Sequence, residues 1–197
     1  DVVLAAGSTA NWTITGANSS IADDLLVNGG ILTLENTVFS LNDDVIVTNP
    51  GTVLNLNSTG VLATNNPAGT SSGLYSRNGA VININADNIN GVSNANGMDF
   101  IQVGDATVGA IGTLNTNTFS TTTPQLVVGG VALGLEGQVI GTGTIVGTSA
   151  TADTGFLFRR GLVSANLAGP ANIFKSGLGV MTLSGDNSGL TGVTNAR

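Results

Sequence analysis

Carboxylates are the side chains of this sequence that are best placed for chemistry, and four of them occur as two pairs. Asp23-Asp24 precedes one short apolar run, and the pair returns as Asp43-Asp44 before another. If this interval is one coil of a stacked β-structure, the pairs lie above each other at roughly the 4.8 Å strand spacing, where like charges repel unless solvent or a cation separates them. A hard cation such as calcium could bridge them. The alternative is four solvated turn residues, which the absence of EF-hand and nonapeptide calcium patterns favours.

Most other catalytic chemistry is excluded, because the sequence contains neither histidine nor cysteine. Ser-His-Asp and Cys-His catalysis, His-bearing metal triads and disulfides are therefore impossible within this chain. Paired carboxylates could serve carbohydrate cleavage, but sugar clefts need aromatic platforms, and the chain has only one Trp, one Tyr and six Phe. We therefore predict that the chain is not an enzyme and uses no cofactor. A carbohydrate-active, pectin-lyase-like β-helix stays open as an alternative.

A second candidate site is the place where bulky apolar and cationic side chains adjoin in this acidic chain. It consists of Phe156, Phe158, Arg159 and Arg160. Aromatic side chains and arginine are frequent hot spots of protein interfaces, so this segment is a candidate for partner binding. The competing interpretation is an ordinary strand, in which alternation points both phenylalanines into the core.

The low charge and its negative balance limit the partners. Only 9% of the residues are charged, the net charge is −7 and the pI is about 4.1. Such a chain repels nucleic-acid phosphates and anionic headgroups, and no apolar run reaches the roughly 18 residues of a membrane span. We expect no nucleic-acid partner and no direct membrane insertion of this segment.

The elements that must position these residues have a period of two. Short apolar runs bounded by Gly, Asn, Asp and Pro predict strands, and good helix formers such as Lys, Glu and Gln are scarce. The predicted strands cover residues 25–27, 31–34, 45–47, 53–56, 81–84 and 126–128.

The spacing of these runs indicates a repeat. Asp23-Asp24 returns as Asp43-Asp44, Leu34 returns as Leu56, and a glycine followed by an apolar run recurs at residues 30–34, 51–56, 79–84 and 179–183. One such unit is too small to bury its own face, whereas stacked units share a continuous core and pair their backbones. We therefore predict an all-β, right-handed parallel β-helix over residues 1–197, with asparagine ladders at its turns. Residues 65–78 and 118–124, rich in turn residues or in Thr and Ser, are expected to be loops.

The C-terminal part carries a motif. Residues 173–187 read Ile-Phe-Lys-Ser-Gly-Leu-Gly-Val-Met-Thr-Leu-Ser-Gly-Asp-Asn, and Gly192 and Thr194 follow. This segment resembles the passenger-associated repeat of bacterial autotransporters, with Met181 in place of an aliphatic residue and Leu190 in place of an aromatic one. Residues 161–197 are the C-terminal coils of the resemblance. Leu183 is expected to face the core.

The resemblance implies a passenger segment of a longer chain, secreted or displayed on the surface of a Gram-negative bacterium and followed by an outer-membrane β-barrel translocator. We expect adhesion or self-association as the function, because a long β-helix stalk would present loops and a polar ladder face to other molecules. The implied partners are host-cell or extracellular-matrix molecules, or the same protein on neighbouring cells. A scaffold for an activity located elsewhere in the passenger stays open as an alternative, because a fold alone does not determine a function.

Overall fold

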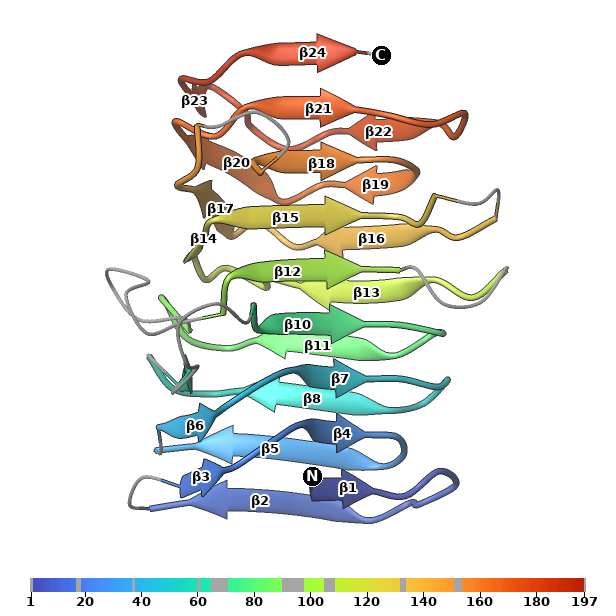
Figure 1. Ribbon diagram of the computed structural model, residues 1–197, viewed down its shortest axis with the longest axis vertical. Coiled ribbons are helices and arrows are strands. Elements are labelled where there is room, and N and C mark those ends of the chain that lie inside the picture. Colours follow the sequence, from blue (N-terminus) through green and yellow to red (C-terminus); the bar gives the residue numbers. More distant parts are fainter. Residues whose placement is uncertain are drawn as a thin grey trace.

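The computed structural model describes residues 2–16, 19–36, 38–59, 61–64, 71–89, 98–104, 109–131, 134–150 and 154–196. In these ranges every regular element is a β-strand, and every strand pair is parallel. Strands stack along one axis from the N-terminal to the C-terminal end, so the predicted all-β solenoid is confirmed (Figure 1). None of the described residues forms a helix long and apolar enough to cross a bilayer.

The strands of successive coils form three faces of the stack. Sheet A contains β1 (Val2–Leu4), β4 (Leu25–Val27), β7 (Val45–Val47), β10 (Gly73–Ser76), β12 (Phe100–Val103), β15 (Gln125–Val128), β18 (Phe156–Phe158), β21 (Ile173–Lys175) and β24 (Thr194–Ala196). Sheet B contains β2 (Asn11–Thr15), β5 (Ile31–Glu35), β8 (Val53–Leu56), β11 (Val81–Ile84), β13 (Gly112–Asn115), β16 (Gly137–Ile140), β19 (Gly161–Val163) and β22 (Met181–Leu183).

The third face is made of two shorter sheets. Sheet C contains β3 (Ser19–Ile21), β6 (Phe39–Leu41) and β9 (Leu62–Thr64), and sheet D contains β14 (Thr121–Thr123), β17 (Thr144–Gly147), β20 (Asn166–Gly169) and β23 (Gly189–Leu190). Two hydrogen bonds connect them through the coil between: Leu62 N donates to Ile89 O, and Asn88 N donates to Ser120 O. The backbone pairing therefore continues across this break.

The register confirms the repeat read from the sequence. Leu25 pairs with Val45, at the same interval as the two acidic pairs, and Leu34 pairs with Leu56. The four glycine-led segments all lead into strands of sheet B.

Coils nevertheless differ in length. Between paired strands of sheet A, the coil from Phe156 to Ile173 is the shortest, and the coil from Leu126 to Phe156 is the longest. The strands stay in register because the coils differ in the length of the segments that connect their strands.

Alternation places one side of each strand inside the solenoid. Along sheet B, Leu32, Leu54, Ile82 and Leu114 follow one another in register and are each at most 1% exposed. Comparable columns from sheet A and the third face meet them in one hydrophobic cluster. A fully buried aliphatic side chain contributes about 1.5–3 kcal/mol, so this shared core provides the main favourable free energy of folding.

Asparagine side chains continue the stacking on the outer side of sheet B and at its corners. Thr33, Asn55, Asn83 and Asn115 are joined from coil to coil by amide hydrogen bonds of 3.2, 2.9 and 3.2 Å. A parallel ladder joins Asn57, Asn85 and Asn117, and a third, at the corner between sheets A and B, joins Asn28, Asn49 and Asn78. The second and third ladders lie beyond the strand ends and confirm the prediction of ladders at turns, whereas the first lies within the strands of sheet B.

A column of glycines marks the corner where sheet A turns into sheet B. Gly112, Gly137 and Gly161 pair in register at the start of β13, β16 and β19. A methyl group on Gly137 would lie 1.9 Å from the carbonyl oxygen of Val103, and one on Gly112 would lie 2.1 Å from that of Ser76. Backbone approaches backbone so closely at this corner that only glycine fits.

Two expected loops contain strands instead. Residues 65–70 lie outside the described residues, but β10 occupies Gly73–Ser76 in the first expected loop, and β14 occupies Thr121–Thr123 in the second. Thr121 and Thr123 are fully buried, and the hydroxyl of Thr123 donates to Gln125 O at 2.9 Å. Thr is β-branched and favours strands, so composition alone was misleading here.

The position of Leu183 also differs from the expectation in part. It pairs with the buried Val163, so its side chain belongs to an inward-facing column, but it is 38% exposed. The reason is that β22 is the last strand of sheet B in the described residues, and no further strand covers it.

We predict that Gly137→Ala destabilises the fold by about 3 kcal/mol or more, because its methyl group would lie 1.9 Å from the carbonyl oxygen of Val103 and 3.1 Å from the backbone nitrogen of Gly129. Gly177→Ala is the matched control: Gly177 has a φ of 74° and nothing within 4 Å of the added methyl, so it incurs only the left-handed backbone cost of about 1–2 kcal/mol. The measurement is the free energy of unfolding from denaturant titration. Equal losses in the two variants would contradict the tight corner.

Candidate functional site

The acidic pairs lie where the third face turns into sheet A, directly before β4 and β7. Their stacking is as predicted. The Oδ1 atom of Asp24 accepts the backbone N–H of Asp44 at 2.9 Å, and the Oδ1 atom of Asp44 accepts the N–H of Gly73 at 2.8 Å. Each of these carboxylates therefore binds an amide of the following coil at a point where the strand ladder has not yet begun.

Carboxylate or amide oxygens also connect coils at other corners, where the N–H donor belongs to the following coil or, for Asp99, to the preceding one. Ser72 N donates to Asp99 Oδ2 at 2.9 Å, and Ser120 N donates to Asp87 Oδ1 at 2.7 Å. Asn172 Oδ1 accepts the N–H of Val193 at 2.7 Å in the C-terminal coils. An Asn or Asp oxygen is thus a recurrent connector between coils, which gives these carboxylates a structural role that does not require a ligand.

Three of the four predicted metal candidates come together. One carboxylate oxygen from each of Asp23, Asp24 and Asp43 lies within 4.8 Å of the other two, whereas Asp44 is outside this group. Calcium takes six to eight oxygen ligands, so three carboxylates would leave the remaining positions to water. The cation interpretation and the solvated interpretation of these residues both remain predictions.

Among the acidic residues that the structure describes, Asp44 is the one whose surroundings disfavour the ionised carboxylate. Burial raises the pKa of Asp44 above its ordinary value of 3.8, the hydrogen bond from Gly73 opposes this rise, and the negative charges of Asp43 and Asp24 add to it. The raised pKa means that protonation favours the folded state. Asp44 therefore destabilises the fold at neutral pH, and this cost disappears as the pH falls through its raised pKa.

We predict that Asp44→Asn raises the melting temperature at pH 7, because the amide oxygen can still accept the Gly73 N–H while the buried charge is removed. The gain should shrink as the pH falls and vanish below about 3.8, where the parent carboxyl is protonated in both states. Thermal unfolding of the parent and of Asp44→Asn between pH 3 and 7 measures this difference in melting temperature.

Asp186→Asn is the control for this prediction. The hydrogen bond from the Ser188 N–H, followed by that from its hydroxyl, lowers the pKa of Asp186. Because the pKa of Asp186 is lowered in the folded state, its ionised carboxylate stabilises the fold at pH values above the ordinary pKa of 3.8, and this stabilisation is lost in acid. Asp186→Asn should therefore not raise the melting temperature at pH 7. A melting temperature of Asp44→Asn at or below that of the parent would refute the assignment.

We further predict that calcium leaves the melting temperature unchanged beyond ionic screening, since the solvated interpretation is favoured. A ligand held only by the folded state would instead raise it by its binding free energy. Melting curves in calcium and in sodium at equal ionic strength distinguish the two cases. A calcium-specific rise that is lost when Asp23→Asn and Asp43→Asn are combined would establish the cation site and overturn this prediction.

The second candidate site is divided between core and surface. Phe156 and Phe158 are 0% and 1% exposed, and their rings stack inside the solenoid at 5.9 Å between centroids. They are therefore unavailable to a partner, as the strand interpretation of this segment implied. Arg159 and Arg160 follow at the corner between sheets A and B, and partner binding by these two residues stays a prediction.

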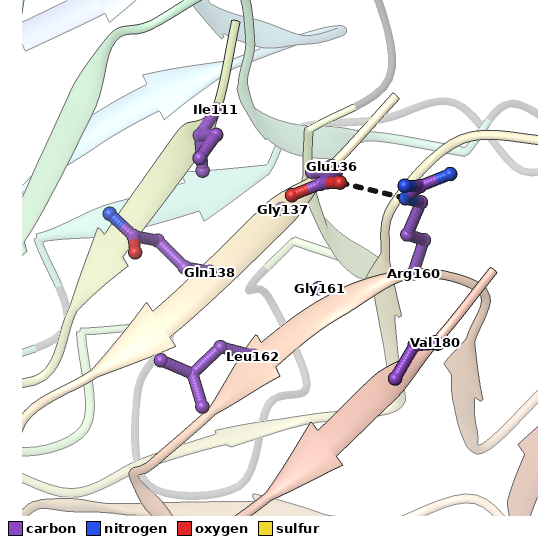
Figure 2. A pocket seen from close by; sticks show the side chains of 8 residues that line it. All are labelled: Ile111, Glu136, Gly137, Gln138, Arg160, Gly161, Leu162 and Val180. Carbon is purple, nitrogen blue, oxygen red and sulfur yellow. Dashed lines mark hydrogen bonds and ion pairs between the residues drawn. The ribbon is translucent and has the colours of Figure 1, made fainter. Parts of the chain in front are cut away.

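A pocket of about 280 Å³ lies beside Arg160, on the outer side of sheet B (Figure 2). Arg160 Nε donates to Glu136 Oε1 at 2.7 Å, and Gln138 Nε2 donates to Thr113 Oγ1 at 2.8 Å. The pocket is lined by Ile111, Glu136, Gly137, Gln138, Arg160, Gly161, Leu162 and Val180.

This pocket was not predicted from the sequence. Its residues come from four successive strands or their preceding turns, and only the register of sheet B brings them together. The available signal was the glycine column, because Gly137 and Gly161 leave the hollow between the flanking side chains.

Two other hollows have different linings. One, of about 420 Å³, follows the glycine- and asparagine-rich corners around Gly29 and Asn49, and the other, of about 410 Å³, lies at the N-terminal coil beside Trp12. Neither of these, nor the pocket at Arg160, is lined by two carboxylates. None of the three therefore has the paired acids of a glycosidase site.

The C-terminal motif has a physical explanation within the coil that it forms. Lys175 Nζ donates to the carbonyl oxygens of Ser176 and Gly177 at 3.0 and 2.8 Å, which closes the turn after β21. A methyl group on Gly179 would lie 2.6 Å from the Cβ atom of Arg160, and one on Gly185 would lie 2.1 Å from the oxygen of Ala165. This turn and the close stacking therefore account for Lys175, Gly179 and Gly185 of the motif.

No protein family matches this chain. Neither a curated protein nor a solved structure matches it either.

Proposed function

We propose that this chain is a non-catalytic, surface-displayed segment of an autotransporter passenger that acts in adhesion or self-association. Two features support the proposal. Residues 173–194 resemble the passenger-associated repeat, and this segment continues the solenoid through β21 and β22 to β24. A long stacked body with the described corners can present side chains at a distance from the cell surface.

The observation that carries the proposal is how the polar groups are used. Two of the four acids that could have formed a catalytic pair, Asp24 and Asp44, accept backbone N–H groups of the next coil, and asparagine amides bind each other along sheet B. These groups hold coils together rather than converge on a reacting atom. In a chain built this way the lateral faces and corners are what remains for interaction with other molecules.

The proposal includes secretion and anchoring. The passenger would be carried to the surface of a Gram-negative bacterium by a following outer-membrane β-barrel. Its partners would be host-cell or extracellular-matrix molecules, or the same protein on neighbouring cells.

We predict that beads coated densely with the chain adhere to a layer of cultured cells or clump with one another, whereas beads coated with an unrelated acidic protein do neither. Dense coating reproduces surface display, in which many weak contacts add up. Microscopy and light scattering measure adhesion and clumping. Beads that neither clump nor adhere would refute the proposal, and depolymerisation of pectin-like polymers by the chain would then favour the carbohydrate-active alternative.

A further inference from the structure

The corner between sheets A and B carries exposed apolar side chains around a cation. Ile111 is 41% exposed, Val131 82%, Leu178 91% and Val180 78%. Ile111 and Val180 line the pocket that also contains Arg160, and Val131 and Leu178 lie on turns of the same corner. We call this set, together with Arg159 and Arg160, the corner surface. Exposed apolar side chains that gather in one region, rather than single ones, mark a surface that meets another molecule.

Arg160 is held in a position to bind a second anion. Its Nε atom donates to Glu136, and its two terminal nitrogens make no hydrogen bond within the described part of the chain. Figure 2 shows the guanidinium at the rim of the pocket, with the carboxylate of Glu136 on one side. A guanidinium has five donors in a fixed plane, so an approaching carboxylate can still be bound by the free edge.

The chain has its own source of such carboxylates. Residues 1–100 hold eight acidic side chains and one arginine, a net charge of −7, whereas residues 101–197 hold four acidic and four basic side chains, a net charge of zero. The whole net charge of −7 thus belongs to the N-terminal half of the solenoid. The N-terminal half of one copy is therefore complementary in charge to the corner surface of another.

The two regions lie on opposite sides of the stack and at different heights. Asp23 and Asp43 precede strands of sheet A, while Arg159 and Arg160 follow one. In Figure 1 the starts of the sheet A strands are on the left, with β4 and β7 low, and the corner after β18 is on the right and higher. One surface cannot reach the other within a single copy.

We propose that the corner surface binds the acidic N-terminal half of a second copy of this chain. The proposal rests on the proposed function and names the contact for self-association. The contact is heterologous, since different patches meet, so each copy keeps one free patch and assembly continues in steps rather than closing as a dimer. Each contact is weak and salt-sensitive, and dense display makes the assembly effective.

Sedimentation of the purified chain over a range of concentrations tests the contact. We expect reversible association at about 0.01 M salt and its loss at about 1 M, where the Debye length falls from about 30 Å to about 3 Å. Corner variants are Arg159→Gln with Arg160→Gln, and separately Val180→Ser, whose exposed side chain can be replaced without loss of the fold. The acidic variant combines Asp23→Asn with Asp43→Asn, and Asp186→Asn is its matched control.

Each corner variant and the acidic variant should weaken association by about tenfold or more, and the control should not. Mixing the double-arginine variant with the acidic variant should restore association, but only to a pair, because one copy supplies the intact corner and the other the intact acidic half. A parent chain that stays monomeric at low salt, or variants that associate like the parent, would overturn the inference.

The bead assay separates this inference from the proposed function. Clumping that persists in all the variants would leave self-association in place and assign it to another surface. Absence of clumping and of adhesion in the parent would refute the proposed function itself.

Discussion

Backbone pairing between successive coils is the constraint on which the rest of this structure depends. The N–H and C=O groups of each strand form hydrogen bonds with the coils below and above it. One register of pairing therefore relates the coils on all three faces. Because side chains alternate, this register also decides which residues are buried. The columns of leucine, isoleucine and valine, the asparagine ladders and the glycine corner are consequences of one alignment. A shift by one residue in any coil would turn its apolar side chains outward.

The same constraint explains what the sequence could predict. The recurrence of similar segments predicted the correct pairing for Leu25 with Val45 and for Leu34 with Leu56, because there the coils are short and regular. Asparagine ladders were predictable as well, since a residue that returns in register stands above its counterpart. The stacking of Asp24 on Asp44 follows from the same recurrence.

Other features were hidden by the variable corners. The residues of the pocket at Arg160 come from coils of unequal length. A regular sequence period does not predict which residues of such coils lie next to each other. The composition around Thr121 and Thr123 predicts a loop, although their β-branched side chains pack in a buried column. For Phe156 and Phe158, the alternation of a strand correctly predicted burial, because both rings lie inside the solenoid. Their aromatic chemistry had suggested partner binding instead.

The difference between constant strands and variable corners has a consequence for spacing. The short coil from Phe156 to Ile173 and the long one from Leu126 to Phe156 each add one strand to sheet A, and therefore about 4.8 Å to the height of the stack. An insertion at a corner changes the side chains displayed there. It does not change the distance between successive coils along the axis. Side chains along this molecule consequently stand at whole multiples of one interval, so a polymer with a commensurate repeat can contact many coils at once. A polymer with another repeat falls out of step within a few coils.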